Sequence, residues 1–471
     1  MKPATSAPTL RSIEDLPGPR GWPLVGSLLK VKLSRIHQDM EAWSRVYGPL
    51  FHVRLGTTAV LVVADHDMIL AILRARPHVF QRSSKLRKVA EEMGAMPGLF
   101  TSEGEAWHRQ RRMVMASFAP AHVRAYFAFL LKVTQRLHAR WHQAMIDAAA
   151  IDLRADLKRF TVDVIAGLAF GAEVNSLESG EDPIHRHLDI IFAATFRRVM
   201  SPVAYWRYVK LPADRQLERS VAALNAAIED FIARARARMQ ADPGLRQNPR
   251  NLLEAMIAAA DQSGGAVDDR DVLGNVSTIL LAGEDTTANT LAWLVYLLYR
   301  NPHVLNRAQD EVRRLAPELA ALTPELLDRL EYLEACITEA MRLKPVAPFL
   351  GVETLSDTTV ADVQVPAGTL VWCVMRHDSV DERYFHNADA FEPARWLNGG
   401  DKRVAMPFGA GPRICPGRYL ASLEMKMAMA MLLGNFEIES VATPNGREAQ
   451  ELMSFTMNPV ALQMRLRDAQ L

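Results

Sequence analysis

Residues 408–417 read Phe-Gly-Ala-Gly-Pro-Arg-Ile-Cys-Pro-Gly, and the helical pattern Arg-Tyr-Leu-Ala-Ser-Leu-Glu-Met follows at once. This pattern predicts that Cys415 stands at a helix N-cap and that Pro416 takes the first helical position, where a missing N–H costs least. The dipole and the free N–H groups of such a helix, beginning with Gly417, favour an anionic sulfur. The alternative is a buried structural cysteine that follows a glycine-rich turn.

The remainder of the loop suits a flat ligand with acidic groups, such as haem. An anionic sulfur is the strong electron-donating axial ligand that a ferric haem needs. Gly409, Gly411 and Gly417 let the backbone approach a macrocycle closely. Arg413 can reach an anionic propionate, and Phe408 can pack near the sulfur and tune it.

The loop matches the pattern F-x-x-G-x-R-x-C-x-G in full. This pattern is the haem-binding signature of the cytochrome P-450 family, which the chain therefore resembles. The resemblance extends from the proline-rich segment near residue 16 to the FTMNP segment at 455–459. It implies a mainly α fold with a small β-rich side, in which a triangular helical domain places a long central helix over the haem. The haem would be non-covalent haem b, with Cys415 as the axial ligand to its iron.

A second family motif, W-x-x-x-R, is formed by Trp107 and Arg111. The two residues lie one helical turn apart, so that indole and guanidinium can both face the haem propionates. The alternative is an amphipathic helix with a buried tryptophan. Family members commonly place another cation in the stretch that here reads PVAPFLGVET and has none, and Arg82 is a candidate to replace it.

A third family motif, E-x-x-R, is formed by Glu339 and Arg342, and Arg395 follows in the segment FEPARW. The resemblance implies that these three charges make a buried network that holds the loop under the haem, with a structural and no catalytic role. Glu311 and Arg314 fit the same short pattern, and a solvated i,i+3 pair is the alternative.

A long helix is expected from Asp269 to Asn301, a stretch without proline whose centre reads Ala-Gly-Glu-Asp-Thr-Thr over residues 282–287. Adjacent acids and threonines in an apolar helix break the expected pattern, as functional sites do. Gly283 permits a local widening, and Thr286 can bond back to the carbonyl of Ala282 or Gly283. By resemblance this is the oxygen-activating element, with Asp285 on the proton-delivery route, Thr286 beside the oxygen and Ala282 against the haem. The alternative is a set of polar residues that cap neighbours or face solvent.

The resemblance also indicates which stretches line the substrate pocket. They are apolar or aromatic, and no charge stands out to anchor a substrate acid or amine, so a lipophilic small molecule is expected. For any single residue, membership of the ordinary core is equally compatible. The pocket residues are Leu99, Phe100, Val346, Phe349, Leu350, Met453, Phe455 and Met457.

The predicted function is monooxygenation with O2 and with electrons from a separate ferredoxin or flavodoxin and its NAD(P)H reductase, because no GxGxxG or flavin motif is present. Four cations are expected to steer that acidic donor, namely Arg109, Arg112, Arg418 and Lys426. One alternative keeps the fold but uses peroxide or rearranges an oxygenated substrate. A more remote one is a haem sensor or carrier without turnover.

Composition narrows the class of protein. The 471 residues are 49% hydrophobic and carry a net charge of +1, which gives no global field for nucleic acid or an anionic membrane. Three cysteines without a CxxC or CxxCH pattern argue against disulfides, zinc and covalent haem, and for a reducing, cytoplasmic setting. No apolar run reaches the length of a spanning helix, so a soluble monomer is expected.

No linker or internal repeat divides the chain, so a single domain is predicted over residues 16–471, after a flexible segment at 1–15. The expected elements are an extended strap at 16–26, a hairpin at 50–64, mainly helices from Glu105 to Arg342, short strands after Pro345, a helix from Pro416 to Asn435 and a last hairpin at 436–467.

Overall fold

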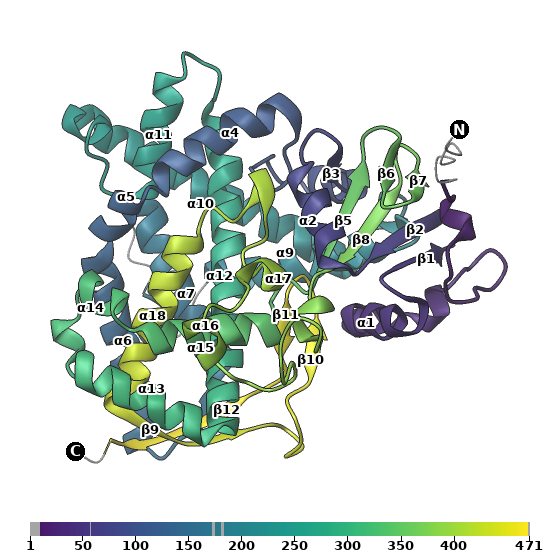
Figure 1. The fold of residues 1–471 in the computed structure, drawn as a ribbon. Coiled ribbons are helices and arrows are strands. Elements are labelled where there is room, and N and C mark those ends of the chain that lie inside the picture. Colours follow the sequence, from purple (N-terminus) through teal and green to yellow (C-terminus); the bar gives the residue numbers. More distant parts are fainter. Residues whose placement is uncertain (1–9, 57, 172–174, 180–182, 470–471) are drawn as a thin grey trace, which may run out of the picture. The chain divides into compact units, whose positions relative to one another are not determined.

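The computed structural model describes residues 10–56, 58–171, 175–179 and 183–469 (Figure 1). These residues divide into two compact units. The first unit comprises the described residues of Met1–Arg87 together with Ala347–Asp389 and Lys402–Cys415. The second unit comprises the described residues of Lys88–Val346, Ala390–Asp401 and Pro416–Leu471.

The first unit is built on a five-stranded sheet of order β1-β2-β8-β5-β3. The predicted hairpin is confirmed, because β1 and β2 pair antiparallel from Leu50 with Val63 to Leu55 with Thr58. β2 then pairs in parallel with β8, which places β2 inside the sheet and buries Val60 to Val63. The elements of this unit are α1 (Ile36–Tyr47), β1 (Leu50–Leu55), β2 (Thr58–Val63), α2 (His66–Arg74), β3 (Phe80–Arg82), β5 (Phe349–Thr354), β6 (Thr358–Val360), β7 (Val363–Val365), β8 (Leu370–Val374) and α17 (Lys402–Ala405).

A flexible segment is predicted at residues 1–15, and residues 1–9 of it lie outside the described residues. Arg11 bridges to Val363 and its side chain pairs with Asp362 at 2.7 Å. Ile13 and Leu16 join the hydrophobic core of the first unit. Residues 10–16 therefore lie against the β6–β7 hairpin and the main sheet.

The second unit is mainly helical, as predicted. Between α3 (Ser84–Glu92), which begins in the first unit, and the C-terminal strands, its helices are α4 (Gly104–Ser117), α5 (Pro120–Ala125), α6 (Phe127–Ile146), α7 (Leu153–Phe170), α8 (Ser176–Ser179), α9 (Pro183–Met200), α10 (Pro212–Ala241), α11 (Leu252–Gln262), α12 (Asp269–Arg300), α13 (Pro302–Leu315), α14 (Pro324–Asp328), α15 (Glu331–Leu343), α16 (Ala394–Leu397) and α18 (Arg418–Asn435).

The long helix α12 organises this unit, where it packs against α7, α10, α11, α15 and α18 (Figure 1). It begins at a capping box in which Asp268 accepts the N–H of Asp271 at 2.9 Å. It ends before Pro302, which starts the next helix. The predicted helix is confirmed in both bounds to within one residue.

Short sheets complete the second unit. The predicted C-terminal hairpin is confirmed, because β9 (Phe436–Ala442) pairs antiparallel with β12 (Gln463–Asp468). β4 (Ile151–Asp152) adds to the other edge of β12. β10 (Glu451–Met453) and β11 (Met457–Pro459) form a separate small hairpin.

Candidate functional site

The cysteine loop belongs to the first unit and folds tightly on itself. The N–H of Cys415 donates to the carbonyl of Phe408 at 3.0 Å, which closes the loop. Gly411 has φ +70°, and a Cβ there would lie 2.4 Å from the carbonyl oxygen of Leu73. Gly409 also has a positive φ of +71°, with open space where a side chain would be. Both positions therefore require glycine, and the loop leaves room beside Gly409.

The predicted helix start is wrong by two residues. α18 begins at Arg418 with Gly417 as its N-cap, and the N–H of Ala421 donates to the carbonyl of Gly417 at 2.9 Å. Pro416 lies in the turn before the cap. Glycine takes the cap because its backbone needs no side-chain cap to turn into the helix. Cys415 therefore lies two positions before the N-cap. The predicted stabilisation of a thiolate by the helix start assumed that Cys415 was itself the cap.

The three cysteines differ in their access to a ligand. Cys336 and Cys373 are fully buried. Burial raises the pKa of the Cys373 thiol to about 12, and burial likewise raises the pKa of Cys336 far above its usual range. Cys415 is only half-buried. Of the three cysteines, Cys415 is the one that is not buried, and it lies in the glycine-rich loop.

α4 carries the predicted propionate pair and two of the predicted donor-steering cations. Trp107 is buried and Arg111 is half-buried, four positions apart on one helix face. Arg112 is exposed, whereas Arg109 donates through Nε to the carbonyl of Ala266 at 2.9 Å.

The predicted surface role of Lys426 is wrong. This side chain is buried on α18, where it pairs with Glu334 at 2.7 Å and donates to the carbonyl of Leu327 at 3.2 Å. The helix is apolar almost all round, so its lysine is held inside by these two acceptors. Arg418, at the start of the same helix, is half-buried over the ring of Tyr419.

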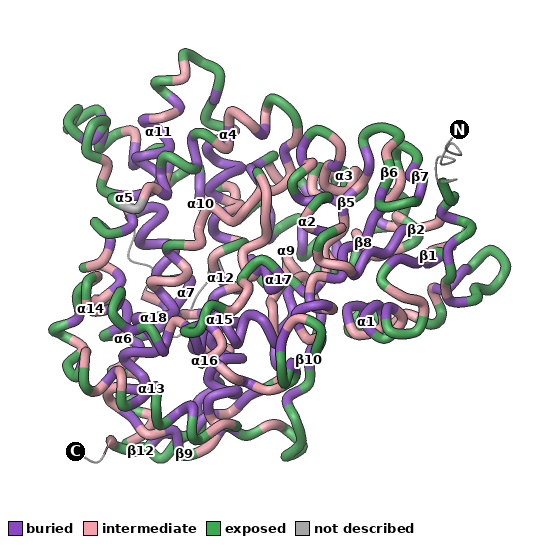
Figure 2. Tube along the Cα trace, viewed as in Figure 1, coloured by how far each residue is buried: buried purple, intermediate pink, exposed green. Residues whose placement is uncertain are grey.

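The centre of α12 opens to solvent on one side. Ala282 is exposed and Gly283 is half-buried, whereas residues 287–298 are buried throughout (Figure 2). Thr286 donates to the carbonyl of Ala282 at 2.6 Å, which confirms the predicted back-bond. α12 is an unbroken α-helix, so the predicted widening at Gly283 is not seen. A Cβ at Gly283 would lie 2.6 Å from Ile165, so the glycine permits close packing on α7 instead.

The other side of the same helix turn faces a buried charge network that sequence reasoning missed. Asp285 accepts a hydrogen bond from Thr456 and pairs with Arg154 at 3.2 Å. The Lys158 ammonium lies 3.4 Å from Asp285 and 3.2 Å from Glu284. Burial opposes the charge of Asp285, but Lys158 and Arg154 outweigh it and hold its pKa below the usual range.

The network continues to the surface through α9. Lys158 also binds Asp189, a half-exposed carboxylate. His185 bridges Glu284 through Nδ1 and Asp189 through Nε2, the latter at 3.3 Å. The signal that could have revealed this network is the run of charged residues in the first half of α7, which includes Arg154 and Lys158.

A second buried acid links α12 to the helix that follows the cysteine loop. Glu424 of α18 is fully buried and bonds to the hydroxyl of Thr287, while its Oε1 has no partner among the described residues. Burial raises the pKa of Glu424 well above the usual range. The hydrogen bond with Thr287 lowers this pKa, but by less than burial raises it. Burial therefore favours the neutral form of Glu424 more than solvent does for an exposed glutamate.

The predicted E-x-x-R network is present in the second unit. Glu339 pairs with Arg342 at 2.7 Å and with Arg395 at 3.0 Å, and both Glu339 and Arg342 have no exposed surface. Trp396 adds a donor that the sequence argument did not name, with Nε1 2.8 Å from Glu339. The four side chains join α15 to α16.

The predicted pocket residues are divided between the two units. In the second unit the Phe455 ring lies 5.8 Å from Phe100 and 5.5 Å from Phe192, an aromatic residue of α9 that the sequence argument missed. Leu99 and Met453 are buried, and Val346 accepts the backbone N–H of Met457 at 2.8 Å. Phe349, Leu350 and Arg82 belong to the first unit, where β3 pairs with β5 and Phe349 contacts Trp372.

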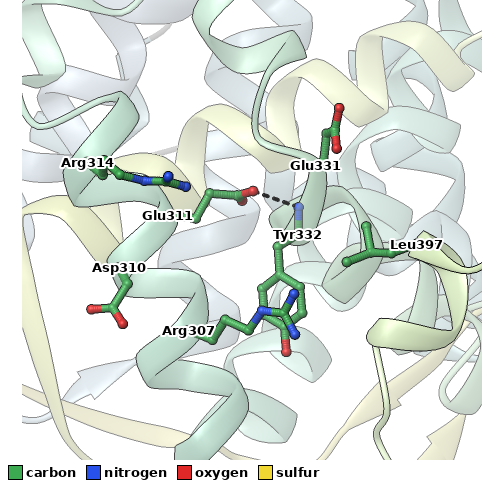
Figure 3. Close-up of a pocket in the computed structure, with 7 residues that line it drawn as sticks. All are labelled: Arg307, Asp310, Glu311, Arg314, Glu331, Tyr332 and Leu397. Atoms are coloured by element: carbon green, nitrogen blue, oxygen red, sulfur yellow. Dashed lines mark hydrogen bonds between the residues drawn. The ribbon is translucent and has the colours of Figure 1, made fainter.

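A surface depression of about 340 Å³ lies elsewhere, between α13, the start of α15 and α16 (Figure 3). Its walls are mostly charged, and they include none of the predicted site residues. Arg307 stacks over the Tyr332 ring at 4.1 Å, and Glu311 accepts the backbone N–H of Tyr332 at 2.8 Å. These contacts complete the start of α15, so the depression has a structural explanation.

Comparison with known proteins yields one family. The family model described as cytochrome P450 matches residues 16–466. The rat mitochondrial 25-hydroxyvitamin D-1 alpha hydroxylase is 28% identical over 452 residues, 91% of this chain and 89% of that protein. The cyclooctat-9-en-7-ol 5-monooxygenase of Streptomyces melanosporofaciens is 28% identical, over 93% and 92% of the two chains.

Two further matches concern fold and length. The crystal structure of the cytochrome P450DA heme domain superposes with a TM-score of 0.84 at 24% identity, over 97% of this chain and 98% of that one. This likeness shows a shared fold. A self-sufficient monooxygenase of Aspergillus niger is 26% identical, and the chain spans 39% of its length. No described helix combines the length and the apolar character that a membrane span needs.

Proposed function

The chain belongs to the cytochrome P450 family of haem monooxygenases, and from this premise we propose that it inserts one atom of O2 into a lipophilic small molecule with electrons from separate redox proteins. The observation that carries the proposal is the two-sided centre of α12. One side offers the exposed Ala282 beside Thr286, and the other connects Asp285 to cations and to the surface. A haem carrier without turnover has no need of that connection.

The residues present fit a non-covalent haem b. Cys415 is the half-buried cysteine of the loop, and Gly409 leaves open space beside it for a flat ring. When bound, haem supplies the electron transfer and the oxygen chemistry. Two groups of residues would hold it: Arg413, Arg82, Trp107 and Arg111 by its propionates, and Phe408, Gly409, Gly417 and Ala282 by close approach.

Asp285 and Thr286 carry the proton chemistry in this proposal. The Thr286 hydroxyl donates to Ala282 and keeps its oxygen lone pairs for a water on the exposed side of the helix. Asp285 remains a carboxylate, because Lys158 and Arg154 stabilise its charge. It takes up a proton and passes it inward only when its hydrogen bond with Thr456 or its ion pair with Arg154 opens. Those contacts therefore control the rate of proton delivery.

The substrate pocket is proposed to be apolar. Phe100, Phe192 and Phe455 form a contiguous aromatic cluster, and burial of apolar surface against such rings stabilises lipophilic ligands. Val346, Phe349 and Leu350 add half-buried apolar surface from the segment after Pro345.

The electron donor is proposed to be a separate ferredoxin or flavodoxin, attracted by Arg112 and Arg418. A lipophilic library is first screened for ligands that shift the haem Soret band toward high spin. Such ligands are then turned over with a surrogate ferredoxin, its reductase, NADPH and isotopically labelled O2. The proposal predicts a product that contains one labelled oxygen atom. Ligand binding and haem reduction without any product would favour the carrier.

A further inference from the structure

Two histidines lie about one helical turn apart on α6, a helix of the second unit (Figure 1). Residues 138–142 read His-Ala-Arg-Trp-His, and positions i and i+4 of an α-helix share one face. The rings of His138 and His142 stack with a centroid distance of 5.9 Å and an interplanar angle of 23°. We call these two side chains the imidazole pair.

The inner ring of the imidazole pair is held in place and the outer ring is free to adjust. His138 is half-buried, and its ring packs on Phe436 of β9 at a centroid distance of 5.2 Å. His142 is exposed, so solvent surrounds its outer side. One ring is therefore fixed in advance, and a rotation of the other is sufficient to aim two nitrogens at one point.

The nitrogens of the imidazole pair are not engaged by other groups. Among residues 10–56, 58–171, 175–179 and 183–469, neither His138 nor His142 forms a hydrogen bond or an ion pair. Burial lowers the pKa of His138, and the neighbouring His142 lowers it further, so the His138 ring is neutral at pH 7. The neutral imidazole is the form that binds a metal ion.

The basic side chains nearest in sequence are directed to acids. Arg136 pairs with Glu178 at 3.8 Å, and Arg140 pairs with Asp156 at 2.9 Å. Their positive charges are therefore offset by carboxylates, which reduces the repulsion that a bound cation would meet beside His138 and His142.

Three other groups of histidines and acids occur among the described residues, and in each of them the ligand atoms already have partners. His66 binds Asp378 at 3.1 Å, and the Arg383 guanidinium lies 3.2 Å from the same carboxylate. In the third group the Lys158 ammonium occupies the place of a cation, 3.2 Å from Glu284. The groups are Asp65, His66 and Asp378; His377, Asp378 and Asp381; and His185, Asp189 and Glu284.

We propose that the imidazole pair binds a divalent transition-metal ion such as Zn²⁺. Zinc takes four ligands, with imidazole nitrogens at about 2.0–2.1 Å, so the pair would supply two ligands and water the other two. Imidazole also suits Cu²⁺ and Ni²⁺, whereas Mg²⁺ prefers oxygen ligands. The site shares no residue with those assigned to the haem.

Chelation is the reason why this pair binds where single histidines do not. Once one nitrogen holds the ion, the second bond forms within the same molecule and at a high effective concentration. His303, exposed on α13, has no histidine three or four positions away and lacks this advantage.

Calorimetric titration of ZnCl₂ into the full-length haem protein, purified without a polyhistidine tag, tests the proposal. The wild type should bind zinc, and His142→Ala should weaken the binding about tenfold or more, because the chelate is lost. His303→Ala is the matched control and should bind zinc like the wild type. MgCl₂ should give no binding at this site.

A second variant separates spacing from the number of histidines. His142→Gln with Gln143→His keeps that number but moves one ring to position i+5, away from the face that carries His138. It should lose zinc affinity as His142→Ala does, and thermal melts without zinc should coincide because residues 142, 143 and 303 are exposed. Zinc affinity equal to that of the wild type in His142→Ala or in the relocated variant would overturn the proposal.

Discussion

Asp285 and Thr286 are neighbours in α12, yet their side chains are held by different partners. Asp285 pairs with Arg154 at 3.2 Å and accepts from Thr456, whereas Thr286 donates to the carbonyl of Ala282 at 2.6 Å. The acid therefore belongs to the charge network of α7, and the hydroxyl belongs to the exposed side of the helix. Substitutions at these two positions should fail in different ways.

Thr286→Ala should uncouple electron use from product formation. Without the hydroxyl, water beside Ala282 is badly placed for proton delivery, so NADPH consumption should continue while most reducing equivalents appear as hydrogen peroxide. Product and peroxide are measured against NADPH consumed. Thr290→Ala is the matched control, since Thr290 makes the same back-bond to Thr286 at 2.9 Å. If both variants uncouple equally, Thr286 only shapes the helix.

Asp285→Asn should slow turnover by about 10²-fold, because an amide keeps hydrogen bonds but does not exchange a proton as an acid does. Haem content and the substrate-induced spin shift should remain. Glu284→Gln is the comparison, because Glu284 pairs with the same Lys158 at 3.2 Å. An equal loss of turnover in Glu284→Gln would assign the effect to the charge around Lys158 and not to a proton carried by Asp285.

Glu339→Gln should strongly destabilise the fold. The change leaves the fully buried Arg342 without its carboxylate, and removal of one partner from a buried pair costs about 3–5 kcal/mol. Urea unfolding measures the loss. Glu311→Gln is the comparison, because Glu311 belongs to the same short sequence pattern but lines the surface depression. It should lower the free energy of unfolding by about 1 kcal/mol, because it weakens the contact that caps the start of α15. Equal costs would mean that Glu339 is not part of a buried network.

Glu424→Gln should remove a pH dependence of stability. The folded-state pKa of Glu424 lies above the ordinary value of 4.5, so the folded protein holds a proton that the unfolded chain releases. Wild-type stability should therefore fall as pH rises above 4.5, by up to about 1.4 kcal/mol per pH unit, until the folded-state pKa is reached. The variant should gain melting temperature over the wild type as pH rises above 4.5. A difference that does not change with pH would contradict a raised pKa of Glu424.

Local pattern was sufficient to predict most of the fold. The alternation at 50–64 indicated β1 and β2, and the proline-free stretch before Pro302 indicated α12. The start of α18 was misplaced because a Cys-Pro-Gly run offers two plausible caps, and backbone geometry decides for Gly417.

The charge network of the site was beyond such reasoning. Arg154, Lys158 and His185 reach Asp285 and Glu284 from two other helices, over sequence separations that no local pattern encodes. Lys426 was misjudged for the same reason, because Glu334 and the carbonyl of Leu327 hold it inside the second unit. Only the folded chain shows which charges are paired.

The central claim is that Cys415 is the thiolate ligand of the haem, and the spectrum of the reduced protein with carbon monoxide tests it most directly. Thiolate ligation gives a strongly red-shifted Soret band. The wild type and Cys373→Ser should both show this band, since Cys373 is a fully buried neutral thiol. Cys415→His should bind haem without it. If Cys415→Ser keeps the band while Cys373→Ser loses it, the ligand assignment is contradicted.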